Sequence, residues 1–131
     1  MIEIKISKKQ LLYCLTRLRK SFACKNALPI LNDYKFEIEG NKLSVVVSDT
    51  ETLTRESFIL PVEAIKVEQD SRKAWCINRY NIVPGLRTLD EQEITMQVMD
   101  YQVRIIHSIG SFSMPIDNAG AYPGTVFKLE E

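Results

Sequence analysis

Two stretches of this chain repeat the same order of predicted elements, and this repetition limits the possible folds more than any other feature. Residues 1–60 and residues 73–114 each have the pattern of a strand, a helix and three further strands. One such unit places a helix on one side of a small sheet. Two units side by side therefore predict an α+β domain, with a continuous, mostly antiparallel sheet and two helices on one face.

The first unit begins with a strand and a helix whose boundaries are marked in the sequence. Ile2, Ile4 and Ile6 alternate with polar residues, as in a half-buried strand. Ser7 and Gln10 form the capping box expected at the start of a helix. The apolar stripe expected to face the core comprises Leu11, Leu15, Leu18 and Phe22. Strands are then predicted over residues 34–38, 43–47 and 52–60.

The second unit follows a polar crossover at residues 61–72. Asn78 is the expected N-cap of a helix that extends to residue 89. Strands are predicted over residues 73–77, 92–98, 101–105 and 111–114. Pro84-Gly85 interrupts the helix, because an internal proline removes a backbone hydrogen bond at a cost of about 3 kcal/mol. We expect a kink, a break or a late helix start there.

Positive charge is concentrated at the start of a chain whose net charge is zero. Residues 1–25 carry seven Lys and Arg residues against one acidic residue. The residues expected to form a basic face are Lys9, Arg17, Lys20 and Lys25 around the first helix, and Arg79 and Arg87 on the second. Because Tyr13 is the one aromatic residue on this face, the face suits phosphate contacts better than base stacking. Such contacts predict weak, salt-sensitive and sequence-independent binding, unless the charges only keep the face solvated.

The sequence contains no clear catalytic or metal-binding arrangement. His107 is the one histidine, so the common multi-histidine metal sites are excluded. A nucleophile–base pair of Cys76 with His107 is conceivable, but Cys76 lies in a predicted strand, where cysteine is usually a core residue. The five glycines are scattered and form no phosphate-binding loop. We therefore expect a binding domain without a cofactor, a metal or a catalytic centre.

The cysteine count and the hydropathy pattern predict a cytoplasmic protein. The three cysteines are an odd number at wide spacings, which argues against a disulfide framework. No apolar run approaches the ~18–20 residues of a membrane span. The N-terminus lacks the charged and then apolar layout of a secretion signal. No membrane partner is expected.

Five short motifs occur in an order and at a spacing that are typical of one protein family. They are Leu28-Pro29-Ile30-Leu31 after the first helix, the hairpin turn at Gly40, the turn Ser48-Asp49-Thr50-Glu51, the strand Phe112-Ser113-Met114, and Tyr122-Pro123. Together they resemble the N-terminal domain of the bacterial DNA polymerase III β subunit, the sliding clamp. The resemblance extends over residues 1–125, which are expected to form one clamp domain, with residues 126–131 as a tail.

The resemblance implies a DNA-clamp fold, in which helices line the hole of a ring and sheets form the outside. Three such domains per chain, and two chains, encircle duplex DNA and give a polymerase its processivity without catalysing a reaction. The positions that the resemblance places against DNA are Lys9, Arg17, Lys20 and Lys25. Those that it places near the neighbouring subunit are Tyr80, Pro84, Phe112 and Met114. The implied partners are duplex DNA, other clamp domains or subunits, the replicative polymerase and the clamp loader.

The chain differs from the family pattern in two respects. It holds one domain, so a ring would require further copies or further domains, and the peptide-docking pocket between the later domains would be missing. Pro84-Gly85 also interrupts the helix that is expected at the subunit interface. The alternative function is a stand-alone clamp-like module that binds or regulates a replication protein without encircling DNA. An enzyme that depends on Cys76 is the third possibility.

Overall fold

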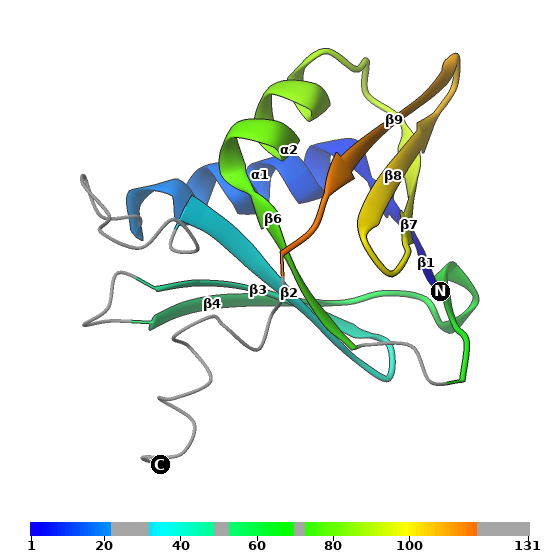
Figure 1. Cartoon of the computed structure of the whole chain (residues 1–131), viewed down its shortest axis with the longest axis horizontal. Coiled ribbons are helices and arrows are strands. Elements are labelled where there is room, and N and C mark those ends of the chain that lie inside the picture. Colours follow the sequence, from blue (N-terminus) through cyan, green and yellow to red (C-terminus); the bar gives the residue numbers. More distant parts are fainter. Residues whose placement is uncertain (22–31, 49–52, 70–72, 118–131) are drawn as a thin grey trace.

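The computed structural model describes residues 1–21, 32–48, 53–69 and 73–117, and within them the repeated order of elements is confirmed (Figure 1). The first unit comprises β1 (Ile2–Ser7), α1 (Lys8–Leu18), β2 (Asp33–Glu39), β3 (Lys42–Ser48) and β4 (Leu53–Ile59). The second comprises β6 (Ala74–Asn78), α2 (Arg79–Arg87), β7 (Glu93–Val98), β8 (Gln102–His107) and β9 (Gly110–Pro115). The crossover between the units contains a strand that was not predicted, β5 (Ile65–Val67).

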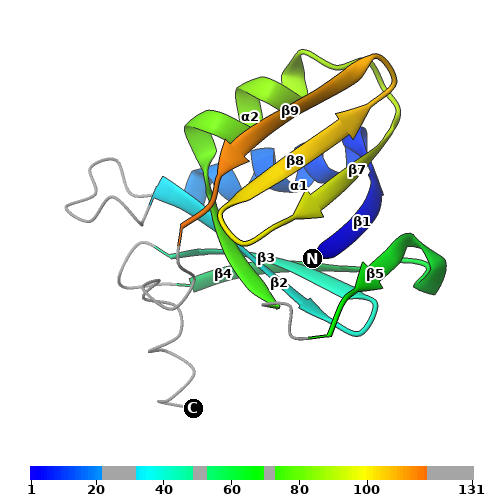
Figure 2. The same cartoon turned by 45° about the vertical axis from the view of Figure 1, so that its right-hand side comes forward.

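The strands form two antiparallel sheets, whereas one continuous sheet was expected (Figure 2). One sheet has the order β5-β1-β7-β8-β9 and the other the order β4-β3-β2-β6. The two units exchange their first strands, because β1 pairs with β7 and β6 pairs with β2. In each unit a helix separates the first strand from the later strands along the chain. The first strand of each unit pairs instead with a strand of the other unit. The predicted α+β class is confirmed, and the single sheet is corrected to two.

The core lies between the two helices and the inner faces of the sheets. Leu11, Leu15 and Leu18 of α1 are buried, as their spacing predicts, and Phe22 lies outside the described residues. The Tyr34 hydroxyl donates a hydrogen bond to the Leu15 carbonyl oxygen at 2.6 Å, which ties β2 to α1. Figure 1 shows α1 and α2 side by side, and the two helices contact each other. Their outward faces therefore belong to one side of the molecule.

Both helices begin at the side-chain caps that the sequence predicts. Ser7 Oγ accepts a hydrogen bond from the Gln10 backbone nitrogen at 3.3 Å. Asn78 Oδ1 accepts one from the Tyr80 backbone nitrogen at 2.8 Å. Each cap satisfies a backbone donor that the first turn of a helix leaves without a partner. The caps thus set where each helix starts and which side chains face outward.

Pro84 lies inside α2 without interrupting it, since the helix extends from Arg79 to Arg87. The break or late start that we expected at Pro84-Gly85 is therefore corrected. The carbonyl that loses its hydrogen bond to the proline belongs to Tyr80, four residues earlier. Tyr80 is 62% exposed, as expected for a position on the solvent side of the helix. The proline falls on the exposed side of the helix, where its cost is small.

Gly85 is the point at which α2 lies against β9. A Cβ atom added to Gly85 would lie 2.7 Å from Cε2 of Phe112, which is too close for two carbon atoms. The glycine therefore allows the Phe112 ring of β9, an edge strand of the five-stranded sheet, to reach the second helix.

A Gly85→Ala substitution is expected to lower the free energy of unfolding by about 1 kcal/mol, because displacement of the Phe112 ring outweighs the higher helix propensity of alanine. Urea unfolding curves would measure this change. Gly110→Ala is the matched control, since the nearest atom to its added Cβ is in His107 at 3.9 Å. A Gly85→Ala variant that is as stable as the wild type would contradict the close packing.

Candidate nucleic-acid interface

The outward face of α1 carries the side chains that the sequence predicts. Lys9, Arg17 and Lys20 are exposed, and so are Tyr13 and Thr16 on the same face. The face exists because the leucine stripe on the opposite side is buried, which leaves the other positions of the 3.6-residue period in solvent. Lys9 and Lys20 have no acidic partner within salt-bridge distance among the described residues. Lys9 and Lys20 are therefore the cations of this face whose charge no described carboxylate neutralises.

Arg17 differs from these lysines because it is already paired. Its Nε donates to Glu56 Oε2 at 3.1 Å, and its terminal nitrogen also pairs with the Glu56 carboxylate. The guanidinium group lies over the Tyr13 ring, 4.9 Å from the ring centroid. Arg17 therefore connects α1 to β4, and Glu56 offsets much of its charge. This pairing could not be predicted from local spacing, because the two residues are 39 positions apart.

The second helix contributes Arg79 and Arg87, which line a pocket of about 350 Å³ together with Arg19. Arg79 Nη2 donates to the Tyr80 hydroxyl at 2.7 Å, and its guanidinium group lies 4.8 Å from the centroid of the Tyr80 ring. Arg19 was not among the predicted site residues. It belongs to a 3-10 turn, η1 (Arg19–Ser21), that follows α1, so the period of α1 did not predict its position.

Several features that carry the predicted site and the resemblance lie outside the described residues. They are Lys25, the Leu28-Pro29-Ile30-Leu31 motif, most of the turn at residues 48–51, Tyr122-Pro123 and the tail. Their roles stay predictions.

The four residues predicted near a neighbouring subunit fall on α2 and β9. Tyr80 and Pro84 are exposed on α2, and Phe112 is half-buried against that helix. Met114 is 5% exposed, so its side chain belongs to the core and only its backbone is near the sheet edge. Because β9 is one of the two edge strands of its sheet, α2 and β9 together form one border of the domain.

The arrangement does not support a catalytic pair of Cys76 and His107. Cys76 lies on β6 in one sheet, whereas His107 ends β8 in the other. Cys76 is fully buried, and this burial raises the pKa of its thiol to about 12, so the thiolate nucleophile is disfavoured. His107 instead packs against the Phe112 ring, with 6.0 Å between centroids. Among the described residues, no group of three His, Cys, Asp or Glu side chains is arranged to hold a metal ion.

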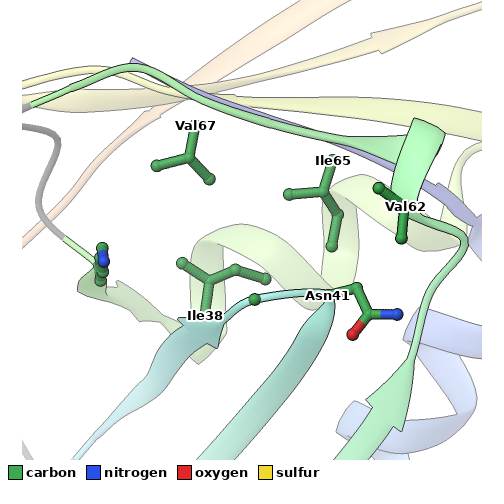
Figure 3. A pocket seen from close by; sticks show the side chains of 7 residues that line it. Ile38, Asn41, Val62, Ile65 and Val67 are labelled. Atoms are coloured by element: carbon green, nitrogen blue, oxygen red, sulfur yellow. The ribbon is translucent and has the colours of Figure 1, made fainter.

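A second pocket lies away from both helices, between the β2–β3 turn and the segment that contains β5 (Figure 3). It has a volume of about 510 Å³ and is lined by Ile38, Gly40, Asn41, Val62, Ile65, Val67 and Lys73. The side chains that line it are mostly apolar, and none of them belongs to α1 or α2. It is therefore separate from the basic face. Within the described residues, no helix has the length and apolar character needed to cross a bilayer.

The comparisons with known proteins agree with this geometry. The family profile of the DNA polymerase III beta subunit, N-terminal domain, matches residues 2–126. A DnaN sliding clamp from Pseudomonas aeruginosa, solved with griselimycin, superposes with a TM-score of 0.80 at 17% identity over 93% of this chain and 32% of that chain. A Helicobacter pylori beta clamp, solved with a DNA ligase peptide, gives 0.76 at 21% identity over 92% and 32%. Caulobacter crescentus pol III beta gives 0.75 at 20% identity over 92% and 31%.

At these identities the solved structures establish the fold alone. This chain spans about a third of the length of each of them. Among curated proteins, none matches the chain.

Proposed function

Because the chain belongs to the family of DNA polymerase III beta subunit N-terminal domains, we propose that it is one domain of a sliding clamp, the non-catalytic accessory subunit that holds a DNA polymerase on its template. The observation that carries this proposal is the helical side of the domain. Lys9 and Lys20 are exposed there, and α2 lies beside α1 with Arg79 and Arg87. Cations of this kind contact the phosphate backbone without reading sequence.

The proposed partners follow from the same assignment. A ring that encircles DNA requires further clamp domains, and this chain spans about a third of the solved clamps. We assign the border of α2 and β9 to the neighbouring domain, through the side chains of Tyr80, Pro84 and Phe112 and the backbone at Met114. The polymerase and the clamp loader would bind the completed ring in the cytoplasm. The peptide in the H. pylori clamp comes from a DNA ligase, which supports peptide segments of DNA enzymes as a partner class.

Replacing Lys9 and Lys20 together by Glu is expected to weaken binding to a short DNA duplex and to flatten its salt dependence. Each lysine–phosphate contact contributes about 0.9 to the slope of log K against log salt concentration, so the slope should fall by roughly 2. Fluorescence anisotropy over a series of salt concentrations measures this slope. Arg17 is left unchanged, because Arg17→Glu would place a second carboxylate against Glu56.

The matched control is a double variant with Lys42→Glu and Lys66→Glu, which makes the same change of charge at exposed sites on β3 and β5. Its slope should stay close to that of the wild type. If both double variants lose the same affinity, net charge rather than the helical face explains binding. A chain that binds a complete clamp but no DNA would favour the stand-alone module instead.

A further inference from the structure

Three arginine side chains from two separate elements line the pocket beside α2. Arg19 comes from the turn that follows α1. Arg79 and Arg87 come from α2, where they lie about one helical turn before and one turn after Val83. The remaining lining residues are Tyr34, Tyr80, Val83 and Pro84. Among the residues that the structure describes, no acidic side chain lines this pocket of about 350 Å³. The described part of its wall is therefore mainly cationic and aromatic.

The three positive charges act on the hydroxyl of Tyr34, which also lines the pocket. Burial raises the pKa of the Tyr34 hydroxyl to about 12, while the charges of Arg79, Arg19 and Arg87 each oppose that rise. All three guanidinium groups are therefore close enough to affect the same oxygen atom. That oxygen is held in place, because it donates to the Leu15 carbonyl at 2.6 Å.

Two arginines outside the pocket are neutralised by carboxylates, and Arg19 and Arg87 differ from them. Arg17 pairs with Glu56, and Arg55 pairs with Glu37 at 2.5 Å. Arg19 and Arg87 have no acidic partner within salt-bridge distance among the described residues. Like charges gathered at one place repel one another, and an anion that enters between them removes this repulsion. The guanidinium fork is suited to the oxygen atoms of carboxylate and phosphate.

We propose that Arg19, Arg79 and Arg87 form a discrete binding site for one phosphate group. The pocket lies between the end of α1 and the side of α2, the elements that carry the proposed DNA face, so a phosphodiester of duplex DNA is one source and free phosphate the other. The first source rests on the proposed function, and the second does not. A tetrahedral group with several oxygen atoms can accept hydrogen bonds from more than one guanidinium group, which a single carboxylate does less well. Such a site differs from the diffuse contacts of Lys9 and Lys20, because it holds its anion in one position.

The test is an NMR titration of the full chain with inorganic phosphate, with sodium chloride and sodium acetate at matched ionic strength as references. Phosphate is expected to give saturable shifts at the backbone amides of Arg19, Tyr34, Tyr80 and Arg87. Arg19→Gln and Arg87→Gln are each expected to weaken this binding about tenfold, through the loss of one charge-assisted contact. Both residues are exposed, and melting curves would verify that each variant is folded. Lys66→Gln, at an exposed site on β5 outside the proposed DNA face, is the matched control and should leave phosphate binding unchanged.

Shifts that do not saturate, that acetate reproduces at equal concentration, or that persist in both arginine variants would overturn the proposal. A second titration, with a short DNA duplex, separates the two sources. Shifts at the same amides that phosphate displaces assign the site to the DNA backbone. Duplex shifts confined to α1 and its lysines, together with saturable phosphate shifts in the pocket, assign it to free phosphate. If the duplex does not bind while phosphate does, the DNA-clamp function fails and the phosphate site stands.

Discussion

The domain is expected to lose stability as the pH rises from about 4 to about 8, and an Asp33→Asn substitution is expected to remove most of that loss. Asp33 is the first residue of β2 and is fully buried. Burial, and then a hydrogen bond with Asp117 and the negative charge of Asp117, raise the pKa of Asp33 from 3.8 to about 8. A hydrogen bond with Asn78 acts in the opposite direction. The folded domain therefore prefers Asp33 in its protonated form.

The chain path after β9 explains why two carboxyl groups meet at this place. The Asp117 backbone nitrogen donates to the Cys76 carbonyl oxygen at 2.9 Å, so the chain crosses from the five-stranded sheet to the edge of β6 in the other sheet. Asn78, two residues along β6, is the register partner of Asp33 on β2. One proton between the two carboxyl groups relieves their repulsion. The same proton therefore stabilises the contact between the segment after β9 and the four-stranded sheet.

The sign of the pH effect follows from the direction of the shift. Asp33 binds its proton more tightly in the folded than in the unfolded state, so its contribution to stability is complete below a pH of about 4 and is lost as the pH rises through about 8. Over that range the free energy of unfolding falls by up to roughly 1.4 kcal/mol per pH unit. Asparagine keeps the shape and a hydrogen-bond donor but has no proton to lose.

Urea unfolding at several pH values, followed by the fluorescence of Trp75, the single tryptophan, measures this dependence. The wild type should become less stable as the pH rises, and Asp33→Asn should be more stable than the wild type at the alkaline end. Asp100→Asn, in an exposed turn, is the matched control and should keep the wild-type slope. An Asp33→Asn variant with an unchanged slope would rule out Asp33 as the titrating group.

Trp75→Ala is expected to lower the free energy of unfolding by about 3–5 kcal/mol, which is a large part of the stability of a domain of this size. Trp75 lies on β6 with 2% of its surface exposed. Its ring stacks on Phe36 of the neighbouring strand, with centroids 5.7 Å apart and planes inclined by 4°. Because β6 comes from the second unit and β2 from the first, this stack is one of the contacts that join the two units. Circular dichroism would measure the loss, since the variant has no tryptophan.

Trp75→Phe keeps an aromatic ring that can stack on Phe36 and removes the rest of the indole, so it tests the two contributions separately. The indole nitrogen is buried and has no hydrogen-bond partner in the described part of the chain, so its removal relieves a desolvation cost. The variant should therefore keep most of the wild-type stability and lose about 1 kcal/mol or less from the smaller volume. If alanine and phenylalanine destabilise the domain equally, packing against Phe36 does not explain the role of Trp75.

Much of the fold could be predicted from local spacing. The isoleucines of β1 and the leucines of α1 recur at the periods of a strand and a helix, and Ser7 and Asn78 cap the helices as expected. The pairing of the strands could not be predicted in the same way. Alternation predicts which face of a strand is buried but leaves its partner open, so the exchange of β1 and β6 between the units was missed.

The candidate site was likewise predictable only in part. The exposed face of α1 was predicted because it lies opposite the apolar stripe, and Lys9 and Lys20 are on it. The pairing of Arg17 with Glu56 and the inclusion of Arg19 in the pocket were not predicted, because they depend on β4 and α2, which are distant in the chain. The break or late start expected at Pro84-Gly85 was wrong, since α2 continues through Pro84 and Phe112 lies beside the glycine.

Residue order along the chain was thus sufficient to predict two repeated units, the caps of their helices and one cationic helix face, since each of these depends on neighbours within a few positions. The number of sheets, the neutralisation of Arg17, the convergence of three arginines on one pocket and the proton held at Asp33 all depend on three-dimensional packing. Each joins residues that are far apart in the chain. Their energies come from burial and from charges brought close together, and neither exists until both units have folded against each other.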